Sequence, residues 1–352
     1  MRFPTASGLL ASLLCFIASP AARADDDALK TALAGDNDPK RSFIFTFEAA
    51  PAGNYARARF EGWCQEYPPN EPLQYVVVLT DSNATGSKND PSVGGAVSPA
   101  WKKWASDHHS AIVTTDIYGT AQSESEKSDH PSWEASGGSG DALVLMLDEF
   151  GKAFNRPEIY RIPLILIGRG TRGQFAYEFA QWRPTRVAAF VVWNGKPTTR
   201  LRAPTKDSLH VPGLFVYNQY AANIPYAEKL VEEWAAGRSL GAPWGLAPAN
   251  VKQALLGPLR VPAATNPRAV DAVTSFLPDL LSSFLDEALS SPQGTGKAWI
   301  GDPHTGTISA ATDDDAALAL SWFPGEATAK SWAAVFSPTA PLVGTATSAA
   351  AP

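Results

Sequence analysis

Short apolar runs that alternate with amphipathic segments constrain the fold of this 352-residue chain more than any other feature. Continuous apolar runs at 73–81, 162–168 and 186–195 are typical of strands that a sheet buries on both faces. Helix-like segments separate such runs, with clear examples at 141–154 and 172–182. The alternation predicts an α/β fold, with a mostly parallel central sheet, right-handed crossovers and helices on both faces.

The first two strand-like segments follow a different pattern. Residues 42–50 and 55–63 alternate apolar and polar side chains around a Pro-Ala-Gly-Asn turn, which predicts an antiparallel pair. No change of composition marks a second domain, so we expect one domain over residues 41–337. The polar segment 25–40 and the Ala-, Thr- and Ser-rich segment 338–352 are expected to be flexible.

The first 24 residues are typical of a signal peptide. Arg2 precedes an apolar stretch, Leu9–Ala18, and Ala22–Ala24 has the small-x-small form of a cleavage site. The apolar stretch is too short for a stable transmembrane helix. We therefore expect an exported protein, periplasmic or secreted, that starts at Asp25 after cleavage and has no membrane association.

The charge and the cysteine content of the chain argue against a nucleic-acid partner and against stabilisation by a disulfide. The formal net charge of −6 leaves no basic surface for nucleic acid. After signal cleavage Cys64 is the remaining cysteine, so an intrachain disulfide is impossible and the fold must depend on its core. Cys64 follows Trp63 and is expected to be packed rather than reactive. The sequence does not determine the oligomeric state.

The segment "GRGTRG", residues 168–173, follows an apolar strand and opens a helix, and it has two interpretations. Its glycines match the G-x-G-x-x-G turn of dinucleotide-binding proteins. That turn expects an acidic residue at the end of the next strand, which here ends in Trp193-Asn194-Gly195. The segment also stands where a hydrolase of the α/β type carries G-x-S-x-G. We therefore expect no nucleotide cofactor, and no His, Cys or acidic cluster has metal-ligand spacing.

Several segments, in order along residues 55–335, resemble an exported bacterial α/β-hydrolase-fold family related to dienelactone hydrolases and esterases. The segments that carry the resemblance are "ASGGSGDALVLMLDEF", "GQFAYEFAQWRPTRVAAFVVWNGKP", "VPGLFVYNQ", "GRSLGAPWG", "WIGDPHTGTI" and "SWFPGEATAKSW". The resemblance implies an α/β-hydrolase fold and a serine, acid and histidine triad.

The position that the resemblance assigns to the nucleophile is Gly170. Glycine has no side chain that could form an acyl-enzyme. The family's elbow also has small residues beside the nucleophile, because the helix packs close to the strand, but Arg172 stands at one of these positions.

The other two triad positions are also empty. The acid position corresponds to Ala221, and the neighbouring Gln219 is neutral. The base is expected within 248–258, and no histidine occurs anywhere from 211 to 303. Three concurrent losses indicate a catalytically degenerate member, a pseudoenzyme.

Other residues could substitute for the triad, but each has a simpler interpretation. Thr171 is expected to start the helix through its hydroxyl rather than act as a nucleophile. His304 is the one histidine after the acid position, in a turn-like segment. His108 and His109 are expected in a solvated turn.

Loss of catalysis does not remove the ligand crevice at the carboxyl ends of the strands. The crevice could hold a small ester, a sugar or an anion, the last at the helix start with nearby arginines. The candidate crevice residues are Ser82, Asn83, Arg169, Thr171, Arg172, Trp193, Asn194, Tyr220 and His304. The simpler interpretation is that aromatic residues at strand ends cap the core. Two alternatives remain: an active esterase with a non-standard catalytic set, and a structural or interaction protein with a closed crevice.

Overall fold

A computed structural model describes most of the chain between residues 42 and 335. The described residues are 42–48, 53–80, 97, 99–119, 132–193, 195, 202–218, 224–249, 279–290, 298–303, 305–312 and 320–335. The predicted signal peptide and the two predicted flexible segments lie outside them.

An eight-stranded sheet forms the centre of the molecule, in the order β1-β2-β4-β3-β5-β6-β7-β8. Its strands are β1 (Ser42–Glu48), β2 (Tyr55–Cys64), β3 (Tyr75–Thr80), β4 (Ser110–Gly119), β5 (Leu164–Arg169), β6 (Val187–Trp193), β7 (Gly213–Asn218) and β8 (Trp244–Ala249). β1 and β2 form the predicted antiparallel pair, and β2 is also antiparallel to β4. The remaining pairs are parallel. This strand order is that of the α/β-hydrolase fold, which confirms the predicted fold class.

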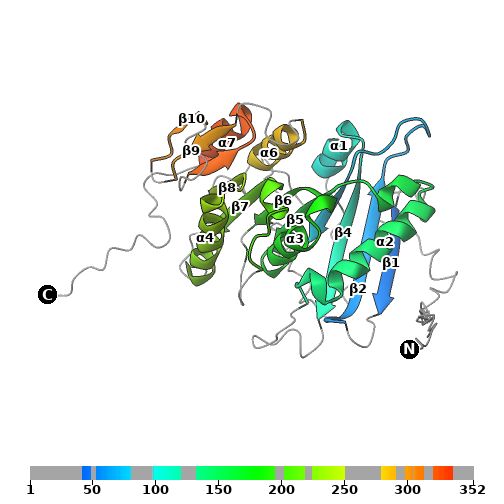
Figure 1. The fold of residues 1–352 in the computed structure, drawn as a ribbon. Helices are drawn as coiled ribbons and strands as arrows, with labels where there is room; N and C mark the ends of the chain where they lie inside the picture. The colour runs from blue at the N-terminus through cyan, green and yellow to red at the C-terminus, as the bar shows by residue number, and fades with distance from the viewer. Residues whose placement is uncertain are drawn as a thin grey trace, which may run out of the picture.

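Helices cover both faces of this sheet, as predicted (Figure 1). One face packs against α2 (Ser139–Ala153), α3 (Thr171–Trp182) and α4 (Ile224–Ser239). The other packs against α1 (Pro99–Asp107), α6 (Asp279–Ser290) and α7 (Glu326–Val335). The apolar periodicity of residues 268–289 predicts a helix, which α6 confirms from Asp279 onward; the first part of that segment lies outside the described residues.

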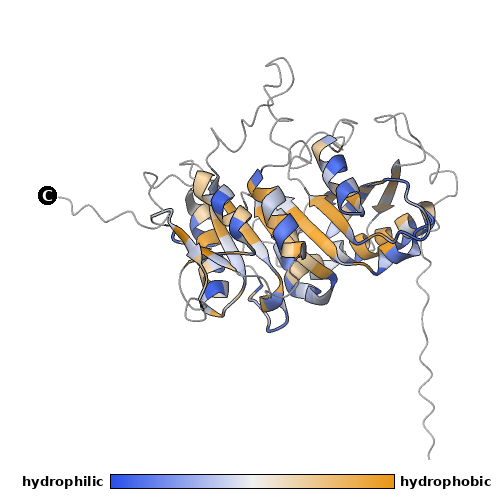
Figure 2. Ribbon diagram, turned by 90° about the horizontal axis from the view of Figure 1, so that it is seen from above, coloured by the Kyte–Doolittle hydropathy of each residue, from blue (hydrophilic) through white to orange (hydrophobic). Residues whose placement is uncertain are grey.

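The continuous apolar runs follow from this layering. In β3, Val76 and Val78 belong to the core on the α2 face, whereas Val77 and Leu79 belong to the core on the α1 face. Successive side chains of a strand point to opposite faces, so a strand covered on both sides needs apolar residues throughout. Figure 2 shows the apolar strands between the two helical layers.

A second, three-stranded sheet lies next to β8 and was not predicted. It consists of β9 (Trp299–Gly301), β10 (Ile308–Ala310) and β11 (Ser321–Phe323) in the order β10-β9-β11. Strands of three residues are too short for an alternating pattern to show in the sequence.

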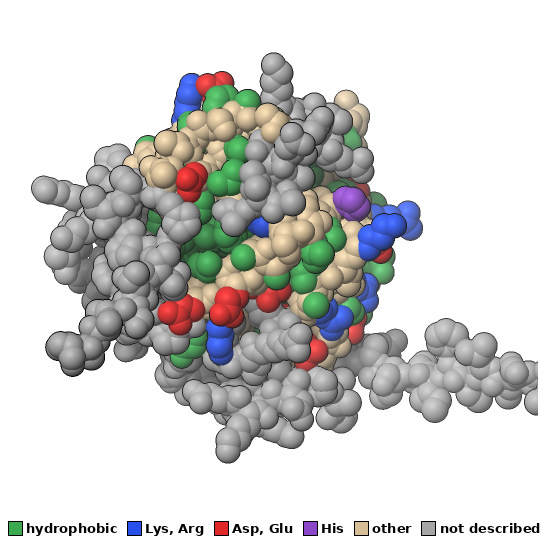
Figure 3. Space-filling view, turned by 60° about the vertical axis from the view of Figure 1, so that its left-hand side comes forward, with side chains coloured by type: hydrophobic (Ala, Val, Ile, Leu, Met, Phe, Trp, Pro, Cys, Tyr) green, Lys and Arg blue, Asp and Glu red, His purple; other side chains and the backbone are tan. Residues whose placement is uncertain are grey.

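On the face drawn in Figure 3, acidic and basic side chains lie side by side among the coloured atoms.

Candidate functional site

The turn between β5 and α3 has the backbone geometry of a nucleophile elbow. Gly170 forms the tip, with φ 59° and ψ −133°, a conformation that residues other than glycine adopt only under strain. Its N–H donates to the carbonyl of Trp193 at the end of β6 (2.9 Å), and its carbonyl accepts from the N–H of Gly173 (3.0 Å). A strained strand-to-helix turn of this kind presents the nucleophile of α/β-hydrolases. Here the residue that it presents is a glycine.

Glycines on either side of the tip allow the helix to approach the strands. A Cβ on Gly168 would lie 2.1 Å from the carbonyl oxygen of Arg172 and 2.7 Å from Oγ1 of Thr80. A Cβ on Gly173 would lie 3.0 Å from Val192. The close approach at Gly168 is therefore made by the backbone of Arg172, and a large side chain at that position is compatible with the turn.

The Arg172 side chain leaves the elbow towards β4. It is 7% exposed, and its guanidinium donates to Oγ of Ser132 (3.1 Å) and to the carbonyl of Ile117. The last β3 pairing is Thr80 with Thr115, and β3 lies between β4 and β5, so the side chain passes over the end of β3. Two of its donors thus bind the protein itself, which argues against the predicted role as an anion ligand.

A buried acid that the sequence reasoning missed lies beside this arginine. Asp116 on β4 is 7% exposed, and one of its carboxylate oxygens accepts a hydrogen bond from the Tyr118 hydroxyl. Burial raises the pKa of Asp116, while the Tyr118 hydroxyl and the charge of Arg172 act in the opposite direction. The signal was present in "AIVTTDIY", where an acid interrupts an apolar strand near its carboxyl end.

Of the remaining predicted crevice residues, two lie at strand ends. Arg169 is the last residue of β5, is partly buried, and pairs in register with Trp193 of β6. Trp193 is 3% exposed and packs in the core on the α1 face, in agreement with the core-capping interpretation. Thr171 is the first residue of α3, after Gly170 at the N-cap; its side chain is not described, so the predicted role of its hydroxyl in starting the helix stays a prediction. Also outside the described residues are Ser82, Asn83, Asn194, Gln219, Tyr220, Ala221 and His304.

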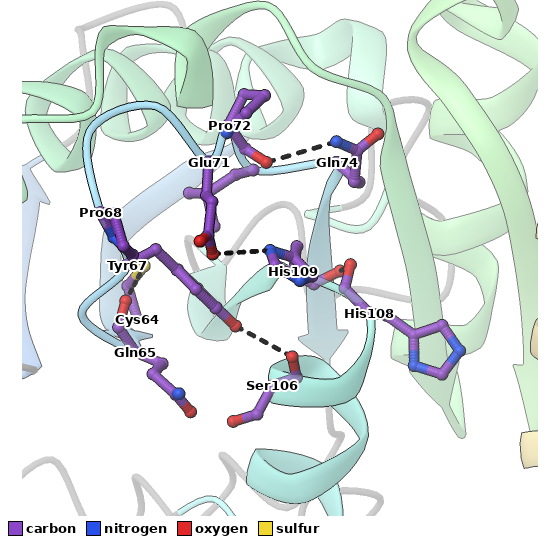
Figure 4. Close-up of polar contacts among 12 residues, drawn as sticks. Cys64, Gln65, Tyr67, Pro68, Glu71, Pro72, Gln74, Ser106, His108 and His109 are labelled. Carbon is purple, nitrogen blue, oxygen red and sulfur yellow. Dashed lines mark hydrogen bonds and ion pairs between the residues drawn. The ribbon is translucent and has the colours of Figure 1, made fainter.

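His108 and His109 lie at the amino ends of the parallel strands, just before β4 starts, whereas the elbow lies at their carboxyl ends. Strands of six to ten residues place these two ends roughly 20 Å or more apart. Figure 4 shows His109 next to Tyr67 and Glu71; its ring stacks on Tyr67, with ring centres 4.9 Å apart. The His108 ring stacks on Trp104 and lies 3.2 Å from the Asp286 carboxylate. The two histidines are in a turn, but with more contacts than a solvated turn implies.

The described residues contain no group of three or more His, Cys, Asp or Glu side chains that could hold a metal ion. In the same part of the chain, no helix is both long and apolar enough to cross a membrane.

Comparisons with known proteins give remote likenesses. No family model and no curated protein matches the chain. Among solved structures it is similar to a thermostable esterase, with 14% identity, a TM-score of 0.43, and 59% of this chain and 54% of that chain covered. It is also similar to poly(aspartic acid) hydrolase-1 from Sphingomonas sp. KT-1, with 14% identity, a TM-score of 0.38, and 58% and 91% covered. A third is MGS-M1, an alpha/beta hydrolase enzyme from a Medee basin deep-sea metagenome library, with 9% identity, a TM-score of 0.39, and 59% and 81% covered.

The chain thus spans about half the length of the thermostable esterase. The α/β-hydrolase fold of this chain is seen in its strand order and in the strand-to-helix turn at Gly170.

Proposed function

We propose that this protein is an exported α/β-hydrolase-fold pseudoenzyme, which keeps the elbow and a ligand crevice but not the serine chemistry. The observation that carries the proposal is Gly170 at the tip of the elbow, with φ 59°. The backbone of the catalytic turn is retained, and the one side chain that it exists to present is missing. The sequence supports this proposal with Ala221 at the acid position and no histidine from 211 to 303.

The experiment that tests this proposal is active-site labelling. A fluorophosphonate probe reacts with activated serines, so the purified protein should remain unlabelled and should not hydrolyse 4-nitrophenyl acetate above the buffer rate. Chymotrypsin, treated in parallel, provides the positive control. Stoichiometric labelling of one residue, or turnover that is lost on Thr171→Ala, would establish the alternative of an active esterase with a non-standard catalytic set.

The elbow region still offers groups that could bind a ligand. α3 begins at Thr171, directly after the carboxyl end of β5, so the positive end of its helix dipole lies at that end of the sheet. Such a helix start favours negative charge, whether a free anion or the carbonyl oxygen of an ester. We therefore propose an anion, a small ester or a sugar as the ligand class.

A second candidate function, a structural or interaction protein with a closed crevice, is favoured by the buried Arg172. Its side chain occupies the space over the end of β3 and bonds to Ser132 and Ile117. Thermal shift with inorganic phosphate, phenyl acetate and glucose separates the two candidates. A saturable rise in melting temperature with one of the three supports a ligand crevice. No rise in the wild type, together with a rise in Arg172→Ala, supports the closed crevice.

Export and domain organisation form a further part of the proposal. We propose cleavage after Ala24 and a single domain over 41–337. Expression of the full chain in a bacterium, followed by fractionation and N-terminal sequencing, should give a mature protein that starts at Asp25. Ala24→Arg blocks the small-residue site and should retain the precursor. A wild-type protein that starts at Met1 in the cytoplasm would contradict export.

A further inference from the structure

A buried carboxylate on α3 lies away from the elbow and is not used by the proposed function. Glu178 lies in the second half of α3, and its side chain is 4% exposed. Its Oε1 accepts the backbone N–H of Arg202 (2.7 Å), and its Oε2 lies 3.5 Å from Nε of the same residue. Among the residues that the structure describes, Arg202 is the cationic neighbour of Glu178, and the shorter of the two contacts is made by its backbone N–H.

Arg202 joins several elements at this point. Its Nη2 donates to Oγ of Ser136 (2.6 Å), in the short helix Ala135–Gly137, and lies 3.9 Å from the Glu134 carboxylate. Its carbonyl accepts from the Tyr177 hydroxyl (2.9 Å). That hydroxyl is also 2.5 Å from a carboxylate oxygen of Glu233 on α4. The guanidinium of Arg202 thus lies near the carboxylates of both Glu178 and Glu134. The third carboxylate of the cluster, that of Glu233, contacts Tyr177.

This arrangement leaves the negative charge of Glu178 poorly compensated. Arg202 is 37% exposed, so part of its charge is screened by water. Burial raises the pKa of Glu178 to about 7; the hydrogen bond and charge of Arg202 oppose the rise, and Glu134 adds to it. Among the described residues, Arg202 and Glu134 are the charged groups that act on the Glu178 carboxyl. Tyr177 precedes Glu178 on the helix, and burial raises its pKa as well.

In the segment 202–207, the contacts with Glu178, Tyr177, Ser136 and Glu134 are all made by its first residue, Arg202. Residues 202–207 are coil and turn and are mostly exposed. Their other end is held by hydrogen bonds between Thr205 and Ser208, at the start of the short helix Ser208–His210. The segment belongs to the connection that leaves β6 at Trp193, the residue whose carbonyl binds the elbow at Gly170. Segments with few buried contacts are the first to open locally.

We propose that Glu178 is a proton-operated latch, which holds residues 202–207 against α3 when it is protonated and loosens them when it is ionised. The latch does not depend on whether the crevice binds a ligand or performs catalysis.

The direction follows from linkage. When the segment opens, Glu178 reaches water and regains its ordinary carboxyl pKa of 4.5, below the value in the closed form. The closed form therefore binds the proton more tightly and is favoured in acid. Opening becomes easier as the pH rises from about 4.5 to about 7, and changes little above that range.

Hydrogen exchange measured by mass spectrometry tests the latch. After correction for the intrinsic exchange rate, the protection of amides in 202–207 should fall roughly 10- to 100-fold between pH 5 and pH 8. Amides of β5 report on global unfolding and should not follow this fall. Glu178→Gln keeps an acceptor for the Arg202 N–H without the charge, so its protection should not depend on pH. Glu228→Gln, an exposed change on α4, should behave as the wild type.

Three results would overturn the latch: protection of 202–207 that is constant in the wild type, a fall that persists in Glu178→Gln, or exchange of the segment together with β5 at every pH. If Glu178→Gln does not fold, Glu134→Gln provides the test. It removes the repulsion but keeps Glu178, so the fall in protection should move to lower pH. An unmoved transition would contradict the proposal.

Discussion

Two residues of the elbow, Gly170 and Arg172, differ from the residues that the α/β-hydrolase pattern has at these positions. Gly170 accepts φ 59° without the strain that a side chain would add, but it provides no nucleophile. Arg172 departs from the small residue of the family pattern, yet the turn accommodates it because the backbone, not the side chain, lies against Gly168. The turn therefore keeps its backbone geometry, and the residue at its tip carries no side chain.

Restoring the hydroxyl at the elbow should not restore catalysis. Gly170→Ser and the matched control Gly170→Ala should each lose about 1–3 kcal/mol of unfolding free energy, because both place a Cβ at a strained φ and ψ. Neither should hydrolyse 4-nitrophenyl acetate, since a serine needs an adjacent base. Urea unfolding and ester turnover measure the two effects. Turnover by the serine variant alone would mean that a base and an acid are present and that their assigned positions are wrong.

Arg172 should stabilise the protein in a pH-dependent way through Asp116. Arg172→Met removes two donors and should cost about 2–4 kcal/mol. Burial already raises the pKa of Asp116 and Arg172 opposes the rise, so the variant should raise that pKa further. A raised carboxyl pKa contributes stability at low pH that is lost as the pH rises. The deficit in urea unfolding should therefore be larger at pH 8 than at pH 5.

The matched controls for Arg172→Met are two further variants. Adding Asp116→Asn should make the deficit independent of pH. Arg183→Met, at the far end of α3 and 38% exposed, should cost less than 1 kcal/mol. A deficit of equal size at both pH values in the single variant would show that Asp116 and Arg172 are not coupled.

At the scale of elements, the two outer strands of the large sheet, β8 and β1, differ in what contacts their outer sides. On the β8 edge, Oγ of Ser321 bonds to both the N–H (3.1 Å) and the carbonyl (2.9 Å) of Leu246. Nε1 of Trp332 donates to the same carbonyl (2.7 Å). Side chains from β11 and α7 thus satisfy backbone groups that would otherwise invite another strand. At the other edge, no strand among the described residues pairs with the outer side of β1.

Removing the Ser321 hydroxyl should show how much its hydrogen bonds to Leu246 stabilise the protein. Ser321 is fully buried, and Ser321→Ala leaves the Leu246 N–H without its partner, which should cost about 1–3 kcal/mol in urea unfolding. Ser309→Ala, an exposed change on β10, is the control and should stay within about 0.5 kcal/mol. Equal effects of the two variants would mean that the hydroxyl does not stabilise the edge.

At the scale of the whole molecule, two hydrophobic cores share one sheet. The core on the α2 face and the core on the α1 face are built from alternating residues of the same strands. Neither core can lose its strands without exposing the other. This physical coupling is the reason to expect the described chain to unfold as one unit, in agreement with the proposed single domain.

Cooperative unfolding can be tested with one substitution in each core. Phe150→Ala on α2 and Phe284→Ala on α6 both truncate fully buried rings and should each cost about 3–5 kcal/mol. Calorimetry should show a single transition in the wild type and in both variants, with its midpoint lowered in each. Two separate transitions, of which each variant lowers only one, would contradict the single domain.

The sequence by itself determined the layered α/β architecture, the antiparallel β1–β2 pair and the position of the elbow. These features depend on local patterns, such as the apolar runs of buried strands and the glycines of a tight turn. The tertiary structure alone decided where long side chains go. The path of Arg172 to β4, the burial of Asp116, the contact between Glu178 and Arg202, and the short strands β9–β11 all depend on residues distant in the chain. A buried polar group takes whichever partner folding brings near it, and no local pattern encodes that partner.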